Sequence, residues 1–154
     1  MDILQEIKKE HDEFKSLISK VEDAEGNKKR ELFEELYAKL NGHHESEEHV
    51  LFPDVKSKSE EEGKSIVREM IEEHHLASYQ FSLLERTSID NETWDAKFSV
   101  LKEVLTHHMD EEEKDFFKQA KKVLKEETLK DKYDDFEKTN EKYKKEKEKQ
   151  LKSK

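Results

Sequence analysis

The chain has 154 residues, 40 of them acidic and 30 basic, and its net charge of -10 argues against nucleic acid or an anionic membrane as the main partner, since both are repelled. It has no cysteine, which excludes disulfides, thiolate zinc sites, cysteine-ligated iron–sulfur clusters and thiol catalysis. Hydrophobic residues make up 31% and charged residues 45%, so we expect one domain with a thin apolar core, in which any metal has nitrogen and oxygen ligands.

The glycine and proline counts and the apolar spacing predict a nearly all-helical chain. There are three glycines and one proline, and apolar residues recur at three- and four-residue steps. The first helix carries an apolar stripe from Ile3 to Val21, in which His11 is the one member that is not apolar. Residues 23–27, with the sequence DAEGN, are expected to end this helix.

The second helix is expected to carry apolar residues from Leu32 to Leu40 on its inner face. The same face continues through His43 and Glu47, which are four residues apart and therefore point the same way. Pro53 lacks the N–H group that a helix interior requires, so the helix is expected to end or kink there.

The third helix is predicted to start at residues 59–62, whose sequence SEEE fits a capping box. His74 lies within the apolar stripe of this helix, as His11 does in the first. Residues 87–91 then form a polar segment, in which Asp90 or Asn91 is the expected N-cap of the fourth helix.

The fourth helix carries His108 and Glu112 on its apolar stripe, again four residues apart. From about Glu127 the stripe becomes sparse and then gives way to a run of lysine and glutamate. We therefore expect a fifth, docking helix, with a folded domain at residues 1–137 and a charged helical or disordered tail at 138–154.

The chain is also duplicated internally. Residues 33–52 match residues 98–117 at a constant offset of 65, and residues 7–21 match residues 70–84 at an offset of 63. Two similar helical hairpins are therefore expected to stack with approximate twofold symmetry. The predicted fold is all-α, an antiparallel up-down four-helix bundle with an additional C-terminal helix and a polar tail.

Six polar side chains are predicted to lie on the inner faces of this bundle: His11, His43, Glu47, His74, His108 and Glu112. Their burial without partners would cost several kcal/mol. Two metal ions bridged by the two carboxylates would remove this cost, with His11 and His43 on one metal and His74 and His108 on the other. Imidazole and carboxylate suit iron, manganese or zinc, and iron is the leading choice because open positions on it would bind dioxygen.

The remaining histidines are rotated by about 100° or more from the inner face and are predicted to lie at the boundary or surface: His44, His49, His75 and His107. His44→Ala is accordingly expected to leave the metal load unchanged, whereas His74→Ala should remove metal from one half of the centre. His75 and His107 adjoin predicted ligands and would replace them if the register were shifted by one. Glu113 is likewise the alternative to Glu112.

Four segments around these residues resemble the hemerythrin family, and specifically its HHE cation-binding domain: KKEHDEF, LNGHHESEEHVLFP, MIEEHHLASYQF and VLTHHMDEEEKDFF. The resemblance covers roughly residues 3–137. The HxxxEExxLFP pattern in the second segment is specific, and its degenerate copy in the fourth segment strengthens the match.

The resemblance implies a centre of two non-haem iron ions with a bridging oxo or hydroxo group. In it the four inner histidines would be terminal ligands, and Glu47 and Glu112 would be bridges. Oxygen-carrying hemerythrins have another histidine one turn after the third-helix ligand, where this chain has Ser78. The missing nitrogen argues against simple reversible oxygen storage, and the His-xxx-Glu spacing of the fourth helix again points to the HHE branch.

The expected function is the binding of dioxygen, or of another diatomic or peroxide ligand, for oxygen or iron binding, storage or sensing. The alternative is a di-iron enzyme acting on nitric oxide or peroxide, or in the repair of iron–sulfur centres. A ferritin-like site is not supported, because the chain has a single Glu-xx-His element, at Glu72 and His75. We expect a cytoplasmic protein, because the N-terminus shows no signal-peptide pattern and no stretch is long enough to span a membrane.

Overall fold

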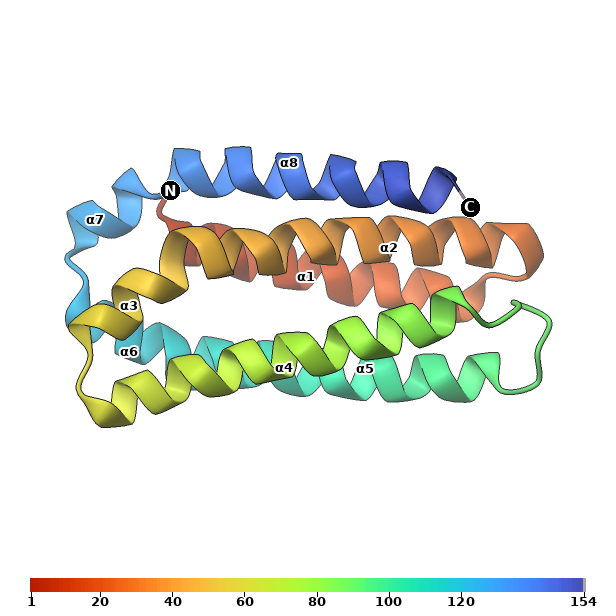
Figure 1. Ribbon diagram of the computed structural model, residues 1–154, viewed down its shortest axis with the longest axis horizontal. Coiled ribbons are helices and arrows are strands. Elements are labelled where there is room, and N and C mark those ends of the chain that lie inside the picture. The colour runs from red at the N-terminus through yellow and green to blue at the C-terminus, as the bar shows by residue number, and fades with distance from the viewer. Residues whose placement is uncertain (154) are drawn as a thin grey trace.

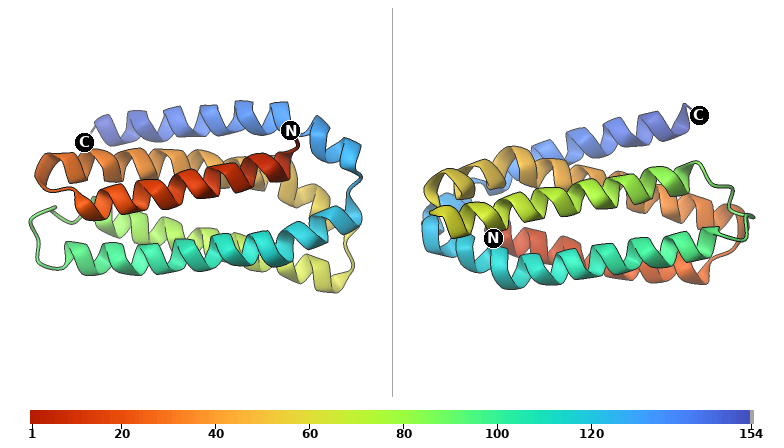
Figure 2. Two further views of the ribbon diagram at one scale, coloured as in Figure 1. Left: turned by 180° about the vertical axis from the view of Figure 1, so that it is seen from behind. Right: turned by 60° about the horizontal axis from the view of Figure 1, so that its bottom comes forward.

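The computed structural model describes residues 1–153, and within them the regular structure is entirely helical. In chain order the elements are α1 (Ile3–Asp23), α2 (Gly26–Ser46), η1 (Glu47–Leu51), α3 (Phe52–Lys58), α4 (Glu61–Glu85), α5 (Trp94–Glu111), η2 (Glu112–Phe116), α6 (Phe117–Val123), α7 (Glu126–Asp131) and α8 (Tyr133–Lys152). Helices α1, α2, α4 and α5 run alternately up and down as two hairpins, and α8 lies alongside α2 (Figure 1). The views in Figure 2 show the same arrangement. The predicted four-helix bundle with an additional C-terminal helix is confirmed.

Two π-helical turns, η1 and η2, interrupt the long helices at matching positions of the duplication. The Phe52 N–H donates to the Glu47 carbonyl, and the Phe117 N–H donates to the Glu112 carbonyl. A turn closed over five residues is wider than an α-helical one, so a four-residue step returns closer to the same face. This geometry keeps one side of the chain buried through both turns, and the expected kink near Pro53 coincides with η1.

Two predicted helix starts are wrong in detail. Helix α4 begins at Glu61, and Ser59 does not cap it, because its hydroxyl donates to the Val55 carbonyl in the preceding helix at 2.6 Å. Helix α5 begins at Trp94, after Asn91 has accepted a hydrogen bond from the backbone of Thr93 at 2.8 Å. In both cases a capping-type side chain is used by a neighbouring turn.

The apolar core is divided into two clusters by a polar layer. One cluster is built around Phe33, Trp94 and Phe98 at the end of the bundle that holds the two hairpin loops. The other is built around Phe52 and Phe116 at the opposite end. On α1, α2 and α4 the inner histidine lies in sequence between the residues of the two clusters, and on α5 His108 lies next to Met109, where the first cluster ends. The polar layer is therefore enclosed by apolar side chains on both sides.

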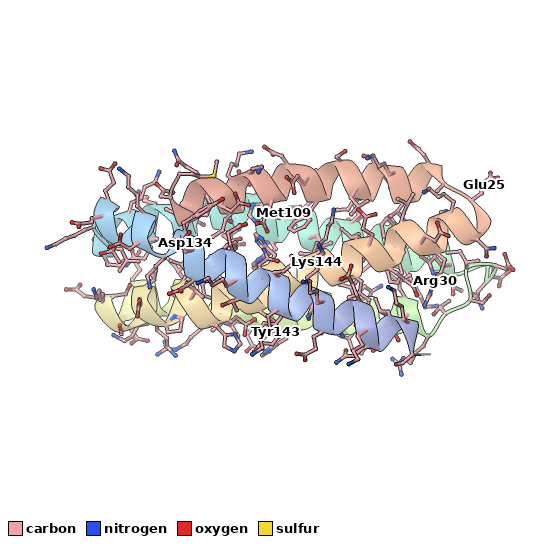
Figure 3. The ribbon with its side chains drawn as sticks, turned by 90° about the horizontal axis from the view of Figure 1, so that it is seen from above. Glu25, Arg30, Met109, Asp134, Tyr143 and Lys144 are labelled. Atoms are coloured by element: carbon pink, nitrogen blue, oxygen red, sulfur yellow. The ribbon has the colours of Figure 1, made fainter. Side chains whose placement is uncertain are left out.

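Helix α8 packs closely on α2, as Figure 3 shows from above, with Tyr143 and Lys144 labelled on it. The Ser46 hydroxyl donates to the Phe136 carbonyl at 2.6 Å, and the Asn41 amide donates to the Tyr143 carbonyl at 3.0 Å. Helix α8 runs from Tyr133 to Lys152 and so continues past residue 137, where we predicted that the domain ends. That domain limit stays a prediction. Among residues 1–153, no helix is long and apolar enough to cross a lipid bilayer.

Helix α8 comes close to the α2 backbone at Gly42, so Gly42→Ala is expected to destabilise the protein. A Cβ atom there would lie 2.5 Å from the backbone and side-chain oxygens of Asn140. We expect a loss of about 1–3 kcal/mol in unfolding free energy, as for other overpacked contacts, measured by thermal or urea unfolding. At a helix position with open space around it, replacing glycine by alanine would instead raise the unfolding free energy by about 0.5–1 kcal/mol. A gain of this kind would show that α8 does not dock at Gly42.

Candidate metal centre

The six predicted ligands meet in the polar layer of the bundle. His11 lies on α1, His43 on α2, His74 on α4 and His108 on α5, and all four are at most 3% exposed. Glu47 and Glu112 are the first residues of the two π turns, and both are fully buried. Each hairpin therefore contributes two histidines and one glutamate to the same layer.

Each carboxylate lies between histidines of different hairpins. An oxygen of Glu112 is 3.1 Å from Nε2 of His11 and 3.8 Å from Nε2 of His108. The corresponding oxygen of Glu47 is 3.2 Å from Nε2 of His74 and 3.6 Å from Nε2 of His43. This crossed arrangement places both carboxylates where each can bridge two metal ions.

The inward-facing atoms of these residues lack hydrogen-bond partners within the described chain. They are the Nε2 atoms of His11, His43, His74 and His108 and both carboxylate oxygens of Glu47 and Glu112. Buried polar atoms are normally satisfied, and leaving one unpaired costs about 1–3 kcal/mol. Eight such atoms in one layer, all of types that bind first-row transition metals, fit a pair of metal ions.

A second set of four glutamates holds the outer side of each imidazole. The Nδ1 atom of each histidine lies 2.7–2.8 Å from a carboxylate oxygen, in the pairs His11–Glu113, His43–Glu10, His74–Glu48 and His108–Glu73. A proton on Nδ1 that is donated to the carboxylate leaves the lone pair of Nε2 pointing inward, as a metal ligand requires. These glutamates therefore orient the rings.

The sequence alone assigned no role to Glu10, Glu48 or Glu73, and it offered Glu113 only as an alternative ligand. A signal was present, because Glu10 and Glu73 match at the offset of 63, and Glu48 and Glu113 match at the offset of 65. Glu113, which was the alternative to Glu112, lies on the Nδ1 side of His11 and not among the inward-facing atoms. In a chain this rich in charge, a repeated glutamate was not distinctive enough to be singled out.

His44 is half-buried, which agrees with the predicted boundary position, but its ring also lies against the inner histidines. Its ring stacks on His74 with centroids 3.7 Å apart and lies 5.4 Å from the ring of His108. Burial and the neighbouring imidazoles of His74 and His108 lower the pKa of His44 well below its ordinary value. A rotation of about 100° from His43 brings the ring beside the adjacent helix α4, because a bundle helix has neighbours on two sides.

Within the polar layer, the potential ligand atoms form two groups that share Glu47. One group consists of His11, His43, Glu47 and Glu112, and the other of His44, Glu47, His74 and His108, with the atoms of each group within 4.8 Å of one another. The two other candidate replacements, His75 and His107, have side chains that are 64% and 72% exposed. The structure therefore brings the six predicted residues together and leaves these two outside.

The charges of the cluster are strongly perturbed. Burial, reinforced by the charge of Glu112, raises the pKa of Glu47 well above its ordinary value. Against the effect of burial, contacts with Glu112 and Glu113 raise the pKa of His11. Burial lowers the pKa of His74 to about 4. These shifts favour the protonated forms of Glu47 and His11, and a bound cation would compete with those protons.

Comparisons with known proteins agree with this geometry. The family model described as Hemerythrin HHE cation binding domain matches residues 2–120. Among solved structures, the fold resembles the crystal structure of a hemerythrin HHE cation binding domain-containing protein from Mycobacterium kansasii, with a TM-score of 0.80 and 24% sequence identity. That match covers 94% of this chain and 88% of the other, and at this identity it shows the shared fold. A search of curated proteins finds no match.

Proposed function

The chain belongs to the hemerythrin HHE cation-binding domain family, as its ligand-bearing segments indicated, and from this we propose that it is a non-haem di-iron protein that binds dioxygen or a related small ligand. The observation that carries the proposal is the layer of four buried, unpartnered Nε2 atoms around two shared carboxylates. These donors match a pair of first-row metal ions in number, type and symmetry.

In the proposed centre, His11 and His43 hold one iron, His74 and His108 hold the other, and Glu47 and Glu112 bridge them together with an oxo or hydroxo group. Iron would supply reversible redox chemistry and open coordination positions for a small ligand. The protein would supply a dry surrounding, since Phe52 and Phe116 are buried at one side of the layer and Phe14 contacts His43 at the other. Water exclusion of this kind protects a bound ligand from hydrolysis and proton leakage.

Binding is favoured over turnover by the roles of the surrounding polar groups. Glu10, Glu48, Glu73 and Glu113 each contact the Nδ1 atom of a histidine and so are committed to holding it. They are not aimed at the unpartnered inner atoms, where a ligand would react. The alternative remains a di-iron enzyme acting on nitric oxide or peroxide, or repairing iron–sulfur centres, and it is separated from binding by experiment.

The test is metal analysis of the purified protein together with its absorption spectrum in air, after reduction and after return to air. We expect two irons per chain and near-ultraviolet bands that bleach on reduction and recover with air. Slow loss of bound oxygen without consumption of peroxide or nitric oxide would support binding, and sustained turnover would support the enzyme. Zinc, or no metal in a folded protein, would overturn both.

A further inference from the structure

The histidine and glutamate side chains around the two halves of the centre are matched except at one position. The histidines, the bridging glutamates and the four orienting glutamates are all matched between the hairpins. His44 breaks this rule, because the residue at the same place in the second hairpin, at the offset of 65, is Met109. Met109, labelled in Figure 3, is 1% exposed and belongs to the apolar core. A thioether and an imidazole thus occupy equivalent positions beside the two half-sites.

His44 lies within reach of the half-site of His74 and His108. One of its ring nitrogens lies within 4.8 Å of ligand atoms of Glu47, His74 and His108. Its ring stacks on that of His74 with an interplanar angle of 13°, so ligation requires the ring to turn from this position. No hydrogen bond to His44 is formed within the described residues, whereas the four inner histidines each have a glutamate on Nδ1.

Helix α4 leaves room for this ring. One turn after His74 it carries Ser78, which provides no nitrogen. Ser78, His44 and His74 line one cavity of about 130 Å³ between α2 and α4. At the matching place beside His11 the first hairpin has Phe14, where the second has the small Ala77, one residue before Ser78. The half-site of His74 is therefore less crowded by its own helix and open to a side chain from α2.

We propose that His44 is a third imidazole ligand of the metal held by His74 and His108, so that adjacent histidines of α2 serve the two different metal ions. This inference rests on the proposed metal centre and makes it asymmetric. One metal has two imidazoles, from His11 and His43, and the other has three. Histidines adjacent in sequence diverge by about 100° on a helix, which is the divergence needed to reach α1 on one side and α4 on the other.

The test compares iron content and Mössbauer spectra of the wild type, His44→Met and His75→Ala, each loaded with iron. Methionine is chosen because the chain already buries one at the equivalent position, so the variant is expected to fold. His75 lines the same cavity but has an exposed side chain, which makes its variant the matched control. We expect two unequal iron sites in the wild type and in His75→Ala. In His44→Met one iron should bind at least tenfold more weakly, and its spectrum should change.

A rescue variant separates ligation from packing. In His44→Met/Ser78→His the imidazole is returned from α4 to the same cavity, so the second iron and its spectrum should be regained. Retention of both irons with unchanged spectra in His44→Met would overturn the proposal while leaving the di-iron centre intact. A wild type that binds no iron would instead overturn the proposed function.

Discussion

Glu47→Gln is expected to cause the largest loss of metal, because Glu47 is shared by both groups of ligand atoms. Its carboxylate lies 3.2 Å from Nε2 of His74 and 3.6 Å from Nε2 of His43, so it faces both half-sites. Glutamine keeps the shape but removes the charge and the second anionic oxygen. We expect both metals to be held more than about 100-fold less tightly, which iron analysis after dialysis and loss of the near-ultraviolet bands would show.

The metal-free Glu47→Gln protein should remain folded. Burial and the charge of Glu112 raise the pKa of Glu47 and so favour its neutral form, which glutamine resembles in shape and charge. Glu48→Gln is the matched control, because Glu48 is the next residue of the same π turn but contacts Nδ1 of His74 at 2.7 Å. It should weaken one half-site by about 10- to 100-fold. Two irons retained by Glu47→Gln would contradict the assignment of Glu47 as a bridge.

The inner ligands could be predicted because they are the few polar residues on otherwise apolar stripes. Helical period alone places His11 and His74 on the inner faces, and the duplication shows that this is not coincidence. The orienting glutamates could not be singled out in the same way. They lie at the edges of the stripes, where glutamate is common in this chain and its position alone does not indicate a contact.

The contact of His44 with the inner histidines, which the helical stripe did not predict, has a geometrical cause. A single stripe describes each helix as having one inner face, but α2 contacts both α1 and α4, and α8 besides. A residue about 100° from the stripe can therefore still be enclosed. The sequence likewise indicated the π turns only in part. Buried residues at four-residue steps from His43 to Val55 would drift around an α-helix, and their common burial is explained by the wider turn at η1.

Removing the metal should lower the melting temperature by roughly 8–16 °C. A ligand present at about 1,000 times its dissociation constant stabilises the folded state by about 4 kcal/mol, and in a chain of this size each kcal/mol corresponds to about 2–4 °C. The source of this stabilisation is the polar layer. Its eight inner atoms have no hydrogen-bond partner among the described residues and would instead coordinate a bound cation. Calorimetry of the iron-loaded protein and of the protein treated with reductant and chelator measures the difference. Glu47→Gln, which should hold little iron, serves as the control that chelation leaves unchanged.

The difference in melting temperature between the iron-loaded and the chelator-treated protein should shrink as the pH falls, because protons and metal ions compete for the same atoms of the layer. Contacts with Glu112 and Glu113 raise the pKa of metal-free His11, and burial with the charge of Glu112 raises that of Glu47. Both groups are therefore protonated below their raised pKa values, and metal binding must release those protons. Affinity should rise with pH up to the raised pKa of His11. His74, with its pKa lowered to about 4, stays neutral and does not add to this dependence near neutral pH. If the difference in melting temperature stayed constant between roughly pH 5 and 8, the range in which histidine ordinarily titrates, the stabilising cation would not bind in this layer.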